Sequence, residues 1–357
     1  MIITKNEELK FDVYNIDLYD NFKKSVNFFK EIKEEFDIEE ILPDFLKSEW
    51  KESFFKKKEK LFKLDEKHEY IKTFDKHSFL FSKLEEVFID KIVLKIFLEK
   101  EKNETIISTL YRFKPNKKGF INPIKYKRHN NVSGRLTVDN SANVLTLPKR
   151  CRSIFKSRFS NGEILSIDFV SLEPRLCLKL SNVKDREDVY EDIKNYLSFK
   201  IDRSVAKRAT ISVLYGKNSI EGFSKEKSEE ILKVVKDYFK IEEIYKLSKN
   251  IDEVGIRRNC VGKPIWNLKE EKQHILINNY IQSSAVDISL SYFSELIEKL
   301  DLKNAVPLFI IHDSLVFDVN KEYKEEFCKL IEKGYLNKKL GYFPIKIETF
   351  NRSKNDW

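Results

Sequence analysis

Two short apolar runs rich in β-branched residues stand out from a chain that is otherwise dominated by helical periodicity. The first run covers residues 163–167 and ends at Asp168. The second covers 307–319 and is interrupted by His312, Asp313 and Ser314. Runs of this length and composition are typical of buried β-strands. The pattern therefore predicts one strand that ends at Asp168 and a hairpin that carries His312 and Asp313 at its turn.

Most of the remaining chain has the apolar spacing of helices. Helices are expected through much of 1–110, over 185–199, 202–216 and 225–249, and as one long helix over about 271–299. Examples of this helical spacing in the first block are Phe79, Leu80, Leu84, Val87, Phe88, Val93, Leu94 and Phe97. Long helices together with an antiparallel hairpin indicate an α+β fold.

The two aspartates predict a metal site. If the strands before them lie side by side, Asp168 and Asp313 meet at one edge of a sheet, where two carboxylates repel each other unless a cation lies between them. Mg²⁺ prefers oxygen ligands and keeps open positions for phosphate oxygens. An aspartate in a turn is common in its own right, so the pairing with Asp168 is what favours a catalytic Asp313.

A basic helix between these aspartates suggests the substrate. Arg203, Lys207, Ile211 and Tyr215 recur every four residues and so share one helix face. Two cations followed by an aromatic ring suit a nucleoside triphosphate, with the phosphates beside Arg203 and Lys207 and the base near Tyr215.

These segments together resemble the family A DNA polymerases across residues 105–357. Asp168 to Arg175 resembles the first conserved motif of that family, in which a glutamate, here Glu173, follows the catalytic aspartate by five residues. Residues 203–216 resemble the fingers helix, and 312–314 resemble the third motif. Two further segments, 133–137 and 278–287, follow the same order as in the family.

The resemblance implies a right-hand polymerase fold with an antiparallel palm sheet and a mostly helical N-terminal region. Residues 1–112 would form that region, including a thumb-like part; 113–180 the first part of the palm; 181–277 the fingers; and 278–357 the second part of the palm. The first 60 residues match no recognisable motif, and no exonuclease motif precedes the palm, so we expect no proofreading domain.

The resemblance also implies a reaction and its ligands. A template-dependent polymerase would add dNTPs to a primer 3′-hydroxyl with two Mg²⁺ ions, or Mn²⁺ in their place, held by Asp168, Asp313 and the backbone carbonyl of Phe169. Lys207 would act on the leaving pyrophosphate, and Glu173 would exclude ribonucleotides. The dNTP site would be formed by Arg203, Lys207, Ile211, Tyr215, Glu173 and His274.

Primer-template DNA is the partner that the resemblance implies. Arg135, Asn278 and Gln282 would face the minor groove near the primer end, and Arg257, Arg258 and Lys263 the template phosphates. His312 would complete the DNA-binding set. An exposed surface role without DNA contact is the alternative for each of the three template cations.

Among the departures from the family pattern, two lie inside the predicted active site. Ile211 stands where the family has an aromatic ring, and Ser314 stands where an acidic residue usually follows the third-motif aspartate.

Composition agrees with a polyanionic partner, because 67 Lys and Arg against 58 Asp and Glu give a net charge of +9. No apolar run approaches membrane-spanning length, so we expect a cytoplasmic protein of a bacterial or phage-infected cell, associated with its DNA and acting in replication or repair. The sequence identifies no accessory protein.

Two alternatives to a DNA polymerase remain. One is a single-subunit RNA polymerase or relaxed-template nucleotidyltransferase, which Glu173 disfavours. The other is an inactive DNA-binding relative, which the retained Asp168, Lys207 and Asp313 disfavour.

Overall fold

The protein is described here as a computed structural model that covers residues 69–128, 131–139, 141–184, 186–252, 256–265 and 272–351. The chain divides into two units, residues 1–68 and residues 69–357, and every described residue belongs to the second unit. The predictions made for the first 60 residues therefore lie outside the described residues.

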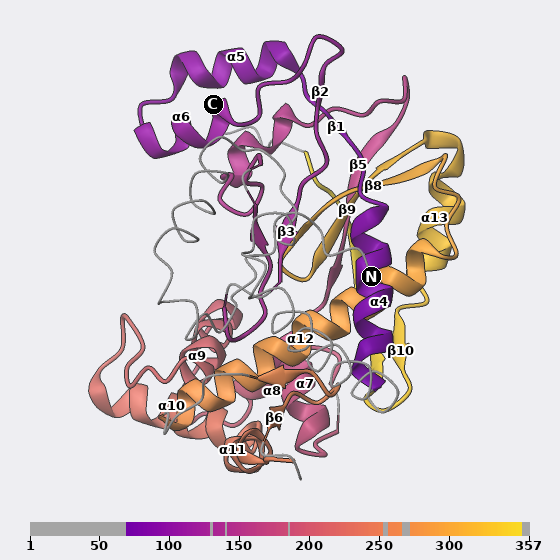
Figure 1. Ribbon diagram of the computed structural model, residues 1–357. Helices are drawn as coiled ribbons and strands as arrows, with labels where there is room; N and C mark the ends of the chain where they lie inside the picture. Colours follow the sequence, from indigo (N-terminus) through magenta and orange to yellow (C-terminus); the bar gives the residue numbers. More distant parts are fainter. Residues whose placement is uncertain are drawn as a thin grey trace, which may run out of the picture. The chain divides into compact units, whose positions relative to one another are not determined.

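A four-stranded antiparallel sheet forms the centre of this unit (Figure 1). Its strands, in spatial order, are β12 (Ile345–Thr349), β5 (Glu163–Phe169), β9 (Ser314–Val319) and β8 (Ala305–Ile311). Residues 312 and 313 are the only two between β8 and β9, so these strands form the tight hairpin that the apolar pattern predicts. The central strand β5 pairs with β9 on one side and with β12 on the other.

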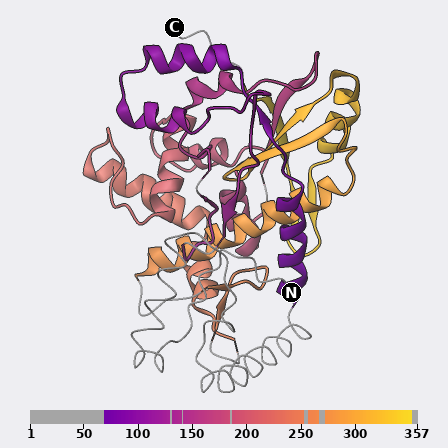
Figure 2. The same ribbon diagram turned by 45° about the horizontal axis from the view of Figure 1, so that its top comes forward.

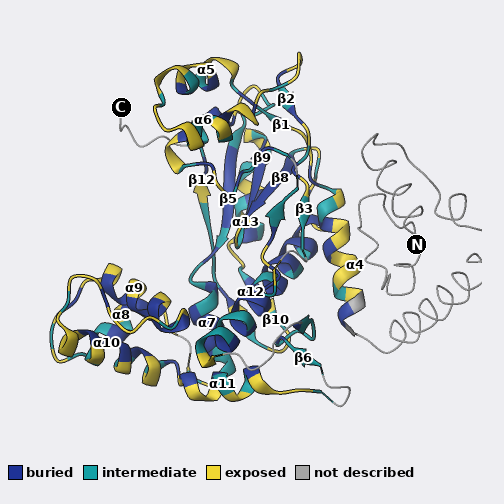
Figure 3. Cartoon of the chain, turned by 60° about the vertical axis from the view of Figure 1, so that its left-hand side comes forward, coloured by how far each residue is buried: buried dark blue, intermediate teal, exposed yellow. Residues whose placement is uncertain are grey.

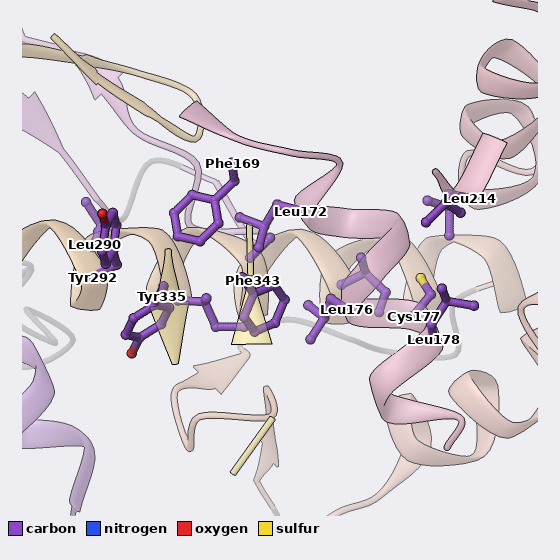
Figure 4. Close-up of a cluster of buried hydrophobic side chains, with 14 of the residues drawn as sticks. Phe169, Leu172, Leu176, Cys177, Leu178, Leu214, Leu290, Tyr292, Tyr335 and Phe343 are labelled. Atoms are coloured by element: carbon purple, nitrogen blue, oxygen red, sulfur yellow. The ribbon is translucent and has the colours of Figure 1, made fainter. Parts of the chain in front are cut away.

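One face of the sheet packs against helices. Leu165, Ile167 and Phe169 alternate along β5, so their side chains share that face, and they join a buried cluster with residues of α7 (Leu172–Leu180), α12 (Gln273–Ile297) and α13 (Lys324–Ile331). Figure 4 shows Phe169 among Leu172, Tyr335 and Phe343 of this cluster. This packing fixes the end of β5 against the start of α7.

The opposite face changes character along its length. Ile164 on β5 and Val316 on β9 join a second buried cluster with residues of α5 (Lys91–Lys100), α6 (Glu104–Tyr111) and the short 3₁₀ helix η2 (Lys149–Ile154). Ser166, Asp168 and Ser314 lie on the same face by the two-residue period of strands. This face is thus apolar at one end and polar at the end where Asp168 lies.

Four helices follow α7 in the segment predicted as the fingers. They are α8 (Val189–Lys194), α9 (Arg203–Leu214), α10 (Lys225–Tyr238) and α11 (Ile241–Lys249), with α8 and α10 both packed on α9. Figure 3 shows buried residues where these helices meet and exposed residues on their outer sides. In two views, α5 and α6 lie beyond one end of the sheet and α8 to α11 lie toward the other (Figures 1 and 3). Figure 2 shows α4 beside the long helix α12.

The structure corrects two predicted helices in this segment and confirms the third. The helix over 202–216 is confirmed as α9. The helix over 185–199 is much shorter, because the Asp188 side chain caps its start and its helical part ends at Asn195. The stretch 225–249 is divided into α10 and α11 at Lys240, which has a left-handed φ of 47°.

The described part of the first block is mostly helical, as its apolar spacing predicts, but the pattern is interrupted between residues 83 and 90. Helix α4 (Glu69–Ser82) ends, the short strand β1 (Val87–Phe88) pairs with β2 (Phe120–Ile121), and α5 then begins where the side chain of Asp90 accepts hydrogen bonds from the amides of Ile92 and Val93.

The predicted long helix is confirmed as α12, which packs against α4, α7, α9 and α11. Three small hairpins complete the described structure: β3 (Tyr126–Lys127) with β4 (Thr137–Val138), β6 (Arg257–Arg258) with β7 (Pro264–Ile265), and β10 (Tyr335–Asn337) with β11 (Gly341–Phe343). None of the described helices is both long and apolar enough to cross a membrane.

The second buried cluster gives a test of the fold. Phe155 is 1% exposed and its ring lies 4.9 to 5.8 Å from those of Phe113, Phe309 and Phe350. Phe155→Ala should lower the free energy of unfolding by about 3–5 kcal/mol, because it leaves a cavity among these rings. Urea denaturation measures this. The control Ile92→Ala, at a side chain that is 74% exposed, should change stability by less than about 0.5 kcal/mol; equal losses would contradict the assigned core.

Candidate active site

The register of the central strands brings the two predicted catalytic aspartates together. Asp168 lies directly opposite Ser314, the residue after Asp313, and the residues paired across an antiparallel ladder have Cα atoms about 4.5–5.5 Å apart. Burial, followed by the nearby charge of Asp313, raises the pKa of Asp168 to about 6. Burial also raises the pKa of Asp313, and the charge of Glu173 adds to that shift. Three carboxylates therefore share one partly buried region.

The turn that carries Asp313 has an unusual backbone. His312, its first residue, has a φ of 55°, in the left-handed region that a residue with a side chain rarely adopts. A two-residue hairpin turn needs such a φ, and the requirement here falls on an exposed histidine instead of a glycine. This strain costs on the order of 1 kcal/mol, and strained residues of this kind cluster at functional sites.

A lysine that was not predicted from the sequence places a positive charge beside Asp168. Lys346 on β12 pairs with Asp168 across the strands. Its Nζ lies 3.1 Å from Oδ2 of Asp168 and 3.0 Å from Oε1 of Glu348. Alternation in 345–349 could have placed Lys346 and Glu348 on one face, but only the sheet topology shows that β12 lies beside β5.

A hydrogen-bonded network joins five predicted residues from four parts of the chain. Nη2 of Arg135 donates to Oε1 of Glu173 and to the hydroxyl of Tyr215, both at 3.1 Å. Nε2 of Gln282 donates to the same hydroxyl at 2.6 Å and to Oδ1 of Asn278 at 2.5 Å. The structure thus connects the predicted sugar-selecting glutamate, the end of α9 and the polar face of α12.

Three residues of the predicted nucleotide-binding face of α9 are exposed, and the fourth is held in an ion pair. Lys207 is exposed, and so are Ile211 and Tyr215, at 43% and 37%. Arg203 instead forms an ion pair with Asp188 at 2.7 Å and lies over the ring of Tyr190. In this conformation, a phosphate would have to compete with Asp188 for Arg203.

His274, in the first turn of α12, lies against the C-terminal end of α9. Gly216 closes α9 with a φ of 69°, and a Cβ at this position would lie 2.3 Å from Cγ of His274. The histidine therefore packs against the backbone beside Tyr215. This contact explains why a glycine is needed after Tyr215, and it places His274 next to the predicted dNTP site.

The three cations predicted to contact the template differ in accessibility. Arg257 and Arg258 lie half-buried on β6, and Nε of Arg258 pairs with Asp252 at 2.6 Å. The ammonium nitrogen of Lys263 is buried, without a hydrogen-bond partner among the described residues. The charge of Asp287 acts on it, while burial lowers its pKa. The template contact of Lys263 stays a prediction, and it requires the ammonium to move out of this buried position.

Asp287 anchors a buried polar network on α12. Its carboxylate accepts hydrogen bonds from Tyr70 of α4 at 3.2 Å and from Nδ2 of Asn259 at 2.7 Å. His77 beside it contacts Arg128 at 2.8 Å, and burial lowers the pKa of His77 to about 2. Asp287, the last residue of the 278–287 segment, therefore has a structural role: it connects α4 and the β6–β7 hairpin to α12.

Residues 25–350 match the family model described as DNA polymerase family A. This chain belongs to DNA polymerase family A. The family resemblance read from the five motifs is thus confirmed.

A solved structure has a similar fold. The POL domain of Pol1 from M. smegmatis, in complex with DNA primer-template and dNTP, superposes with a TM-score of 0.57 at 18% sequence identity. The match covers 69% of this chain and 51% of the other, so this chain spans about half the length of that relative. The likeness confirms the predicted α+β polymerase fold. No curated protein matches the chain.

The raised pKa of Asp168 predicts how stability depends on pH. The folded protein binds this proton more tightly than the unfolded chain, whose aspartates have a pKa of about 4. The ionised side chain therefore destabilises the fold above pH 6, and this cost falls as the pH decreases through about 6. Asp168→Asn should raise the free energy of unfolding by about 2 kcal/mol at pH 8 in a metal chelator.

At pH 4 the same substitution should leave stability nearly unchanged, because the wild-type carboxyl is then mostly protonated. Urea denaturation at both pH values measures the difference. An equal gain at pH 4 and pH 8 would contradict a raised pKa at this position.

Proposed function

We propose that this family A polymerase is a template-dependent DNA polymerase that extends a primer 3′-hydroxyl with dNTPs in replication or repair, and that it is encoded by a phage or another mobile element. The observation that carries the activity is the meeting of Asp168 and Asp313 at the polar end of the sheet face, beside Glu173 and within reach of the network around Tyr215. The fold neighbour solved with primer-template and dNTP supports the same substrates.

The donor set suits two Mg²⁺ ions, or Mn²⁺ in their place. Two partly buried carboxylates with raised pKa values repel each other, and hard divalent cations relieve such repulsion. The described residues contain no group of three or more His, Cys, Asp and Glu side chains placed to hold a metal. Asp168, Asp313 and the backbone carbonyl of Phe169 would therefore share the ions with water and phosphate oxygens. When bound, the ions supply charge neutralisation for the 3′-hydroxyl and the triphosphate.

The chain's own residues would position the nucleotide. Exposed Lys207 and a released Arg203 supply positive charge for the phosphates, with Lys207 nearest the leaving pyrophosphate by motif order. Tyr215, with Ile211 on one side and His274 on the other, forms the surface that the base and sugar would contact. Closure of α9 toward the sheet would exclude water and test the shape of the base pair.

The primer-template would lie along the polar face that leads to this site. Arg135, Asn278 and Gln282 form one network with Tyr215, and these side chains supply donors for the minor-groove acceptors that correct base pairs share. Exposed His312 lies on the turn beside the aspartates, where the primer end would arrive. Arg257 and Arg258 would contact template phosphates.

A primer-extension assay tests the activity. Wild-type protein should extend a labelled primer on a template with dNTPs and Mg²⁺, and Asp168→Asn and Asp313→Asn should each reduce the rate by at least about 10³-fold, because each removes charge that holds the ions. Glu326→Gln, an exposed carboxylate on α13 behind the sheet, is the control and should retain full activity. Unchanged extension by both aspartate variants would refute the assignment.

Sugar selection is tested at Glu173. If its side chain lies under the incoming ribose, a 2′-hydroxyl meets it without a good partner. Glu173→Ala should therefore lower the preference for dNTPs over NTPs by about tenfold or more, measured as the ratio of kcat/KM values. Arg135 pairs with Glu173, so Arg135→Ala serves as a comparison that breaks the same ion pair and keeps the carboxylate. Equal selectivity in wild type and Glu173→Ala would remove this role.

A further inference from the structure

The ammonium of Lys346 occupies a position between two carboxylates of different accessibility. Its Nζ is 3.1 Å from Oδ2 of Asp168, whose side chain is 25% exposed, and 3.0 Å from Oε1 of Glu348, which is 59% exposed. Lys346 also acts electrostatically on Asp313. Each carboxylate of the proposed metal pair is thus already influenced by a positive charge that belongs to the protein.

The sheet register holds this arrangement in place. Lys346 lies opposite Asp168, and Glu348 lies opposite Ser166 on the same strand pair, so the three charged side chains share one face. A cross-strand neighbour contacts its partner without large movement of the backbone. The side chain of Lys346 is 42% exposed, which leaves its flexible stem room to turn between its two partners.

A divalent cation on Asp168 conflicts with this ion pair. Both cations would bind the same carboxylate, and like charges a few ångströms apart repel strongly in a partly buried site. Glu348 offers the ammonium a second acceptor that it already contacts and that belongs to no proposed metal site.

We propose that Lys346 is a resident counter-cation of the catalytic carboxylates, and that binding of a divalent metal ion transfers its ammonium from Asp168 to Glu348. The inference rests on the proposed function, because it takes Asp168 as a metal ligand. Lys346 is then a positioning residue. It keeps the carboxylates close together in the metal-free protein and weakens metal binding until DNA and nucleotide add their own affinity for the ions.

Direct Mn²⁺ binding to the full chain without DNA tests this, with free Mn²⁺ followed by its electron paramagnetic resonance signal. Lys346→Met should bind Mn²⁺ about threefold to tenfold more tightly than wild type, since a competing charge is gone. Glu348→Gln should bind it about twofold to threefold more weakly, because the ammonium loses its alternative partner and stays on Asp168.

Two further variants separate competition from a general change in charge or structure. The double variant Lys346→Met with Glu348→Gln should behave like Lys346→Met alone, since Glu348 acts only through the lysine. Lys324→Met is the matched control: it also removes one positive charge next to β5, where Lys324 pairs with Glu163 at 2.7 Å, and it should leave Mn²⁺ affinity at the wild-type value. Lys346→Arg, which keeps the charge, should also stay near wild type, and thermal denaturation confirms that each variant is folded.

The possible failures are distinguishable. If wild type binds Mn²⁺ and Asp168→Asn does not, the metal assignment stands; equal affinities of Lys346→Met and Lys324→Met would then overturn the inference alone. A raised KM for dNTP in Lys346→Met with unchanged Mn²⁺ affinity would also overturn it, because Lys346 would then contact the nucleotide. Absence of Mn²⁺ binding by wild type would overturn the metal assignment and this inference with it.

Discussion

The repulsion between two carboxylates held together in a partly buried site is the constraint on which the rest of this structure depends. Asp168 is fixed by the ladder between β5 and β9, and Asp313 by the turn that follows β8. Without a cation between them, the side chains would separate or take up protons; burial, and after it the charge of Asp313, raises the pKa of Asp168. The fold tolerates this repulsion because both strands are packed on helices over much of their length, while the strained backbone at His312 keeps the turn tight.

The long helix α12 relates this site to the remainder of the unit. Near its start, His274 packs under Gly216, so the end of α9 is set against it. One to two turns later, Gln282 donates hydrogen bonds to the hydroxyl of Tyr215 and to Oδ1 of Asn278. Further along, buried Asp287 connects the helix to α4 and to the β6–β7 hairpin. A single rigid element thus carries the residues proposed to meet the base pair and also anchors the segments around them.

Local sequence pattern was enough to predict features that depend on neighbours in the chain. The strand ending near Asp168, the hairpin around Asp313 and the four-residue spacing of α9 all follow from local periodicity. Features that depend on contacts between distant segments could not be predicted in this way. Lys346 needs the knowledge that β12 pairs with β5, and the burial of Lys263 needs the position of α12. Likewise, the capture of Arg203 by a cap residue of the preceding helix is decided by packing.

The most direct test of the central claim is the position of bound metal. Crystals of the polymerase with primer-template, a non-hydrolysable dNTP analogue and Mn²⁺ should show two peaks of anomalous scattering, both within about 2.0–2.5 Å of oxygens of Asp168 and Asp313. A map with no peak at this end of the sheet, or with the carboxylates turned away from the ions and the triphosphate, would contradict the account.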